Sequence, residues 1–120
     1  MKVLIAYEYR YRFYSEVLAK GITKHRPHLH VRPTGLEHFE SELEVFDPHA
    51  VVSSQPLSNI DPTNNRAAWV ELPAEPSSPA DICLDGNHAK AYNPTLGELV
   101  SVLDEAEALV LREDRPLDGC

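Results

Sequence analysis

The segment from Tyr7 to Tyr14 carries the clearest chemical signal in the sequence. It holds four of the five tyrosines of the chain and two arginines, Arg10 and Arg12. The guanidinium group of arginine is a planar fork of donors that matches a carboxylate or a phosphate. Tyrosine adds a stacking surface with a polar tip. The segment therefore predicts a site for a small anionic ligand, such as a phosphate or a nucleotide.

Two strand ends are expected to position this site. Residues 2–7 form a continuous apolar run, which is typical of a strand buried on both faces, and residues 50–54 form a second run. In open α/β sheets the ligand crevice lies beyond the carboxyl ends of the strands, where the strand order reverses. The predicted ligand-binding residues are therefore Tyr7, Glu8, Tyr9, Arg10, Arg12, Ser53, Ser54 and Gln55. Alternatively, the segment has only a structural role: the aromatic rings pack beneath the loops, and the arginines form ion pairs with acidic side chains elsewhere in the chain.

Other reactive side chains do not form a convincing site. His25, His28 and His30 lie close in sequence, but Pro27 separates the first from the other two, so we predict no metal site. In a strand, His49 would lie about 13 Å from Ser53, too far to activate its hydroxyl. The glycines form no phosphate-binding loop, so no cofactor is expected. The sequence predicts no catalytic residue, and we expect a protein that is not an enzyme.

The first half of the chain alternates between strands and helices. A helix is predicted over residues 13–25, with an apolar stripe of Phe13, Tyr14, Val17, Leu18 and Ile22. A short strand over residues 28–32 should end at Pro33. A second helix is predicted over residues 36–46, with Thr34 as its N-cap and Glu37 at the capping-box spacing. Crossovers of this length allow parallel, right-handed connections, so the three strands are expected in the order 2-1-3.

The second half of the chain departs from this alternation. Residues 55–66 are predicted to form a loop, and strands are predicted over residues 67–72 and 80–84. The seven residues 73–79 are too few for a parallel crossover, so these strands should pair antiparallel. Asp85–Asn87 is predicted to form a turn, and Thr95 should cap a final helix that runs to about residue 111. We therefore predict one α/β domain, residues 1–111, with an open, mainly parallel sheet, an antiparallel β-hairpin and a final helix. A polar tail, residues 112–120, follows it.

Charge is distributed unevenly along the chain. Its net charge is −8, yet residues 1–36 hold seven basic and two acidic residues, or +5, and the remaining 84 residues hold −13. The negative total argues against general nucleic-acid binding. No apolar run approaches a membrane span, so no membrane association is expected. The two cysteines form no paired motif, and we expect reduced thiols in a cytoplasmic protein.

The first half of the chain resembles the receiver domain of response regulators, which has a flavodoxin-like fold. The residues that carry the resemblance are KVLIAYE at Lys2–Glu8, FDPHAVVSSQP at Phe46–Pro56 and the final helix. Receivers end their first strand in an acidic pair that binds Mg²⁺, and Tyr7 and Glu8 occupy those positions here. The phosphoaccepting aspartate aligns with Ser54. Receivers carry a lysine after their fifth strand, but no lysine follows Leu84 directly here. They also carry a serine or threonine at the end of their fourth strand, and no such residue lies near Glu71.

The resemblance implies a fold without the receiver's activity. A serine cannot form the acyl phosphate, and one carboxylate in place of three is a poor Mg²⁺ site. We therefore expect a degenerate, non-catalytic regulatory or protein-interaction domain of pseudo-receiver type. Its partner would be another protein or a second copy of the chain, through the hairpin or the final helix. The alternative function is a small anionic-ligand binding module that uses the Tyr/Arg segment.

Overall fold

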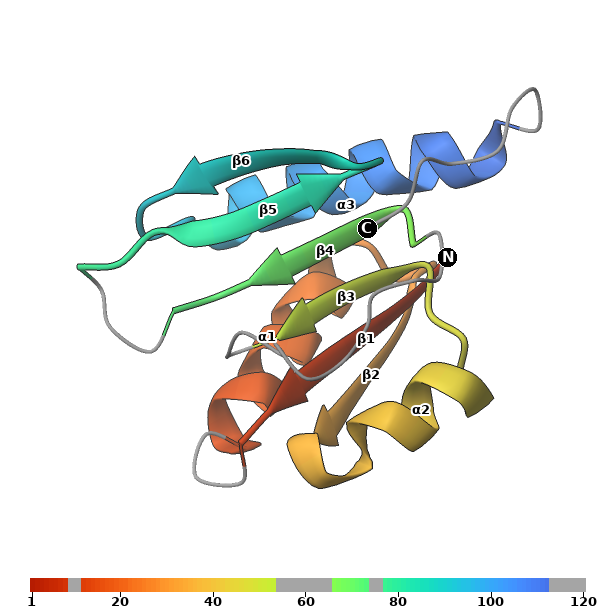
Figure 1. Ribbon diagram of the computed structural model, residues 1–120. Coiled ribbons are helices and arrows are strands. Elements are labelled where there is room, and N and C mark those ends of the chain that lie inside the picture. The colour runs from red at the N-terminus through yellow and green to blue at the C-terminus, as the bar shows by residue number, and fades with distance from the viewer. Residues whose placement is uncertain (9–11, 54–65, 74–76, 113–120) are drawn as a thin grey trace.

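The protein forms a six-stranded sheet with helices on both faces (Figure 1). The structure is a computed structural model, and it describes residues 1–8, 12–53, 66–73 and 77–112. Its elements in chain order are β1 (Lys2–Tyr7), α1 (Arg12–His25), β2 (His30–Gly35), the 3-10 helix η2 (Leu36–His38), α2 (Phe39–Val45), β3 (Ala50–Ser53), β4 (Ala68–Glu71), β5 (Ala80–Leu84), β6 (Asn87–Ala91) and α3 (Leu96–Leu111).

The strand order is β2-β1-β3-β4-β5-β6. Strands β2, β1, β3 and β4 are parallel, whereas β5 runs antiparallel to β4 and β6 antiparallel to β5. The predicted α/β class, the central order 2-1-3 and the antiparallel pairing after residues 73–79 are confirmed. The structure also places β4 directly beside β3, which the sequence pattern left open.

Alternating side chains of the strands build two cores, one on each face of the sheet. Val3 and Ile5 of β1 face α1 and α3, where they pack with Ile22 and Leu103. Leu4 faces the opposite side, in the core that also contains Phe39 of α2. Figure 1 shows α1 and α3 behind the sheet and α2 in front of it. This three-layer arrangement explains why residues 3–6 are all fully buried.

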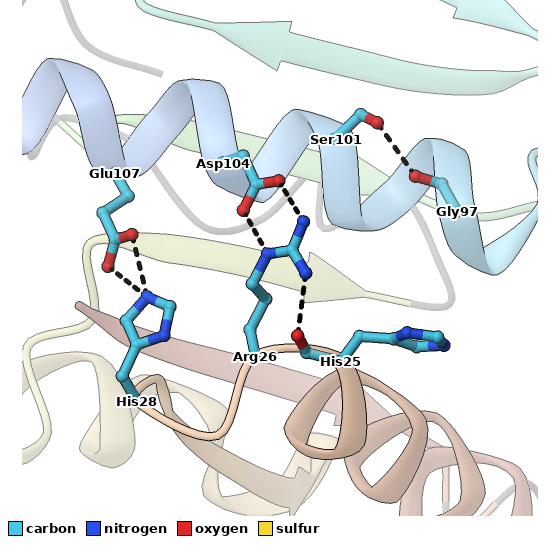
Figure 2. Close-up of polar contacts among 7 residues, drawn as sticks. All are labelled: His25, Arg26, His28, Gly97, Ser101, Asp104 and Glu107. Carbon is cyan, nitrogen blue, oxygen red and sulfur yellow. Dashed lines mark hydrogen bonds and ion pairs between the residues drawn. The ribbon is translucent and has the colours of Figure 1, made fainter.

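A seam of charged contacts fixes α1 beside α3 (Figure 2). Arg26, just after α1, donates from Nε and Nη2 to the two carboxylate oxygens of Asp104, over 2.8 and 2.7 Å. The ring Nε2 of His28 lies 2.9 Å from Glu107 Oε1. A Cβ atom at Gly21 would come within 3.0 Å of Leu96, so the two helices also approach closely near the start of α3.

The face of α1 that packs on the protein differs from the predicted one. Phe13, Tyr14 and Val17 are 77 %, 55 % and 52 % exposed, whereas Ser15 is buried. The predicted stripe is correct at Ile22 and partly correct at Leu18, which are the positions beside the other layers. Ser15, Ala19 and Ile22 follow one another at spacings of four and three residues and form the buried side of α1. The predicted stripe was therefore wrong at Phe13 and Val17, which lie on the outer side of the helix.

Strand β2 and the following helix also begin and end differently from the prediction. Strand β2 runs through Pro33 to Gly35, and it lies at the edge of the sheet, where a strand tolerates proline. Thr34 pairs with Ala6 in the sheet, so it is not a helix N-cap. Instead Gly35 precedes η2, with no side-chain cap hydrogen bond.

Strand β6 is an element that the sequence analysis missed. Asp85 and Gly86 have φ angles of 51° and 85°, the left-handed conformation that a two-residue hairpin turn requires. The turn was predicted, but the strand after it was not, since its residues NHAKA show no apolar alternation. The predicted Thr95 cap is confirmed, because its Oγ1 atom accepts a hydrogen bond from the Glu98 N–H.

Some predictions fall on residues that the structure does not describe, or describes differently. The predicted loop 55–66, apart from Arg66, and the tail after Arg112 lie outside the described residues. Cys83 is disulfide-bonded, so the expectation of reduced thiols is wrong for this residue. Within the described part of the chain, no helix is both long and apolar enough to span a bilayer.

Candidate functional site

The predicted ligand-binding residues divide into those that the structure describes and those that it does not. Tyr7 ends β1, Glu8 follows it, and Ser53 ends β3. Arg12 begins α1, but the position of its side chain is not described. The remaining predicted residues, Tyr9, Arg10, Ser54 and Gln55, lie outside the described residues, and so does the receiver-acceptor position at Ser54.

Tyr7 and Ser53 lie on opposite faces of the sheet. Tyr7 belongs to the core beneath α1 and α3, together with Val3 and Ile5. Ser53 pairs in register with Ala6, whose side chain belongs to the core on the α2 side. Successive strand residues point to opposite faces, and the structure therefore does not bring Tyr7 and Ser53 together in one pocket.

A cleft opens instead between the carboxyl ends of β1 and β2 and the beginning of α1. Its volume is about 280 Å³, and it is lined by Tyr7, Ser15, Glu16, Pro33, Thr34, Gly35 and Glu37. The predicted site and this cleft share Tyr7 and the carboxyl edge of the sheet. The contribution of residues 33–37 was missed, because β2 was expected to stop before Pro33.

Tyr7 carries the distinctive polar group among the residues that line the cleft. Tyr7 is only 4 % exposed, and its hydroxyl has no hydrogen-bond partner among the described residues. Burial, followed by the neighbouring Tyr14, raises the pKa of Tyr7 far above its usual value. The phenol is therefore protonated at every physiological pH and is able to donate a hydrogen bond. The Tyr14 ring packs edge-on against the Tyr7 ring, with 5.5 Å between centroids.

The electrostatic character of the cleft is mixed. Glu16 and Glu37 supply two carboxylates, and the described side chains of the lining include no basic group. Glu37 also lies 4.0 Å from the Nε2 atom of His38. The N-terminus of α1 contributes a helix dipole that favours negative charge. These opposing fields suit a ligand with a hydrogen-bond acceptor at one end and a neutral or positive group at the other.

A second polar cluster lies on the α2 side of the sheet. Glu71, Asp81 and Lys90 are in register across β4, β5 and β6. Burial and the charge of Asp81 raise the pKa of Glu71, whereas Lys90 and His88 oppose this effect. The Lys90 Nζ atom and the His88 Nδ1 atom lie 3.7 and 3.4 Å from the carboxylate of Asp81. Charge pairing with Asp81 therefore joins β6 to β5, whereas Glu71 and Asp81 place like charges opposite each other across β4 and β5. The sequence analysis missed the cluster because β6 and its register were unknown.

The histidines near Pro27 do not gather. His25 ends α1, His28 bonds to Glu107, and His30 begins β2. Among the described residues, no group of three or more histidine, cysteine or acidic side chains is arranged to hold a metal ion.

Comparisons with known proteins add no family to this description. No family model matches the chain, and neither a curated protein nor a solved structure matches it.

Proposed function

We propose that this chain is a non-catalytic binding module that holds a small polar ligand in the cleft between β1, β2 and α1. The observation that carries the proposal is the buried hydroxyl of Tyr7, a residue that lines the cleft, because this hydroxyl has no partner among the described residues. Burying a hydroxyl without a hydrogen bond costs about 1–3 kcal/mol. A ligand that accepts a hydrogen bond from this hydroxyl removes that cost.

The cleft restricts the ligand by size and by charge. A volume of about 280 Å³ admits a small metabolite rather than a chain segment. Glu16 and Glu37 favour a neutral or cationic group at the mouth. The anionic ligand predicted from the sequence is the competing class, and its binding would depend on Arg10 and Arg12.

A thermal-shift screen tests this function directly. The library contains ethanolamine, glucose, inorganic phosphate and AMP as representatives of cationic, neutral and anionic ligands. Because only the folded state binds, a ligand at 100 times its Kd stabilises the protein by about 2.7 kcal/mol, which is about 10 °C or more for a domain of this size. Tyr7→Phe should remove the shift, whereas Tyr92→Phe, at an exposed tyrosine, should keep it. If nothing in the library raises the Tm, or if Tyr7→Phe responds as wild type does, the proposal is wrong.

The classes of ligand are separated by two further variants. Glu37→Gln should weaken a cationic ligand about tenfold, since it removes one charge at the mouth. The Arg10→Ala/Arg12→Ala variant should weaken an anionic ligand instead. If the binding of an anion required the two arginines but not the Tyr7 hydroxyl, the binding site would lie outside this cleft.

A regulatory or protein-interaction domain of pseudo-receiver type is the second candidate. The order β2-β1-β3-β4-β5 favours it, because flavodoxin-like proteins have the order 2-1-3-4-5. The antiparallel direction of β5 is a departure from that fold. On this view Glu8 and Ser54 are remnants of a phosphorylation site. Acetyl phosphate with Mg²⁺ should leave the intact mass unchanged, and a phosphorylated species would contradict the degenerate assignment.

A further inference from the structure

The layer formed by α1 and α3 has an unusual outer surface. Phe13 and Val17 of α1 are 77 % and 52 % exposed, and they lie one helical turn apart on its outer side. Lys20 and Lys24 continue this line along the helix at spacings of three and four residues, and both are exposed. The outer side of α1 therefore changes from apolar to basic along its length.

The outer side of α3 carries the opposite charge. Glu98, Ser101 and Glu105 follow one another at spacings of three and four residues, and all three are exposed. The inner side of the same helix is apolar and buried at Leu99, Leu103 and Ala106. Within the described residues, no ion pair is found for Lys20, Lys24 or Glu105. A basic helix surface and an acidic helix surface thus lie next to each other and face away from the sheet.

The contacts in the seam show that α1 and α3 run in the same direction. Gly21 lies against Leu96, and Arg26 bonds to Asp104 farther along both segments (Figure 2). Lys24 lies between Gly21 and Arg26, and Ser101 lies between Leu96 and Asp104. Lys24 is therefore at about the height of Glu98 and Ser101, whereas Lys20 lies just before the level at which α3 begins and Glu105 lies past the level of Arg26.

We propose that two copies of this chain associate through the α1/α3 layer, with the basic outer side of each α1 on the acidic outer side of the other copy's α3. A two-fold axis parallel to the helices and centred between them keeps every residue at its height. It brings Lys24 of one copy to about the level of Glu98 in the other, with Lys20 near the start of that α3 and Glu105 farther along it. The same contact forms twice, as a closed two-fold interface requires.

The exposed apolar side chains fit the same arrangement. Phe13 and Val17 extend past the start of α3, which begins beside Gly21. The segment that leads into α3 carries a further exposed aromatic side chain, since Tyr92 is 67 % exposed. In the proposed dimer, Phe13 and Val17 form an apolar end beside the charged contact.

Mass measurements on charge-reversed variants test the proposal. Light scattering after size exclusion, from about 10 μM to about 1 mM protein, should approach twice the 13.4 kDa of one chain. Lys20→Glu/Lys24→Glu and Glu98→Lys/Glu105→Lys should each raise the dimer Kd about tenfold or more, since each places like charges on facing helices in both symmetry-related contacts. Glu40→Lys/Glu44→Lys, on the exposed side of α2, is the matched control and should leave the Kd unchanged.

Mixing the two impaired variants gives the decisive result. In a mixed pair, both helix contacts again join opposite charges, so a heterodimer should form where neither variant dimerises alone. Circular dichroism confirms that every variant is folded. A single-chain mass for wild type at all concentrations overturns the proposal. So does a dimer that tolerates both reversals, or a mixture that stays monomeric.

Discussion

The Nη1 atom of Arg66 lies 2.7 Å from the Oδ1 atom of Asp47, and this ion pair ties the segment before β4 to the turn after α2. The same guanidinium donates to the carbonyl oxygens of Pro48, over 2.6 Å, and Leu43, over 3.3 Å. Leu43 lies in the last turn of α2, where carbonyl groups lack partners within the helix. Arg66 is 5 % exposed, so one buried side chain satisfies three acceptors from one segment.

Replacement of Arg66 should therefore cost more stability than replacement of its charged partner. Arg66→Ala leaves buried carbonyls unpaired, and we expect the free energy of unfolding to fall by about 2–4 kcal/mol. Asp47→Asn should cost less than about 1 kcal/mol, because Asp47 is largely exposed and asparagine tolerates its left-handed backbone. Urea denaturation of both variants measures the difference. If the two variants lost the same free energy of unfolding, the ion pair with Asp47 rather than the hydrogen bonds to the carbonyl groups would account for the stabilisation by Arg66.

The turn between β5 and β6 gives a prediction about backbone conformation. Gly86 has a φ of 85°, which a residue with a Cβ atom rarely adopts, so Gly86→Ala should lower the free energy of unfolding by about 1 kcal/mol. Gly97 offers a matched control in the first turn of α3. A Cβ atom there would meet only Thr95 Oγ1 at 3.8 Å, so Gly97→Ala should raise stability by about 0.5–1 kcal/mol. Thermal unfolding of the two variants measures these changes in stability. If Gly86→Ala and Gly97→Ala both raised or both lowered the stability, this interpretation would be wrong.

The sequence predicted the elements whose signal is local. Strands β1 and β5 have the predicted bounds, because continuous apolar runs and a short connection define them. Helix α3 was located by its Thr95 cap and its long apolar stripe. Strand β6 was not predicted, because its side chains are mostly exposed and only its pairing with β5 makes it a strand.

Features that depend on a neighbouring element could not be predicted in the same way. The side of α1 that packs carries Ser15, Ala19 and Ile22, whereas the larger apolar side chains of Phe13 and Val17 are exposed, so residue type within α1 predicted the wrong side. The residues that line the cleft were also only partly predicted, because they depend on where a neighbouring strand ends. Tyr7 was predicted as the end of a strand, whereas Thr34 and Glu37 were missed because an edge strand continued through Pro33.

The burial of His49 predicts a decline in stability at mildly acidic pH. His49 Nδ1 accepts a hydrogen bond from the Lys2 N–H over 3.0 Å. Burial, and then the positive charges of Lys2, the N-terminus and Arg66, lower the pKa of His49 below its usual 6.5, while Asp47 partly opposes them. As the pH falls below about 6.5, the unfolded chain binds a proton that the folded state does not bind at this position. The contribution of His49 to stability is therefore lost with falling pH, by at most about 1.4 kcal/mol for each pH unit.

Urea denaturation of wild type and His49→Asn between pH 8 and pH 5 measures this contribution. The asparagine carbonyl can replace the acceptor but cannot titrate, so the difference in stability between the two proteins should shrink as the pH falls. The lowered pKa values of Asp47 and Asp104, caused mainly by hydrogen bonds from Arg66 and Arg26, act in a separate window below about pH 4. A pH-independent difference between the two proteins would refute the role assigned to His49.

Tyr7→Phe should stabilise the ligand-free protein, although the same change is expected to remove ligand binding. The hydroxyl is buried without a partner among the described residues, so its removal relieves a desolvation cost and keeps the ring contact with Tyr14. We expect the free energy of unfolding to rise by about 0.5–1.5 kcal/mol. Tyr92→Phe, at an exposed tyrosine, should change it by less than about 0.5 kcal/mol. A loss of more than about 1 kcal/mol in Tyr7→Phe would mean that the hydroxyl is bonded within the folded chain. The cleft would then lack the unpaired donor that a ligand needs, whereas a gain would show that the protein keeps this hydroxyl at the expense of its own stability.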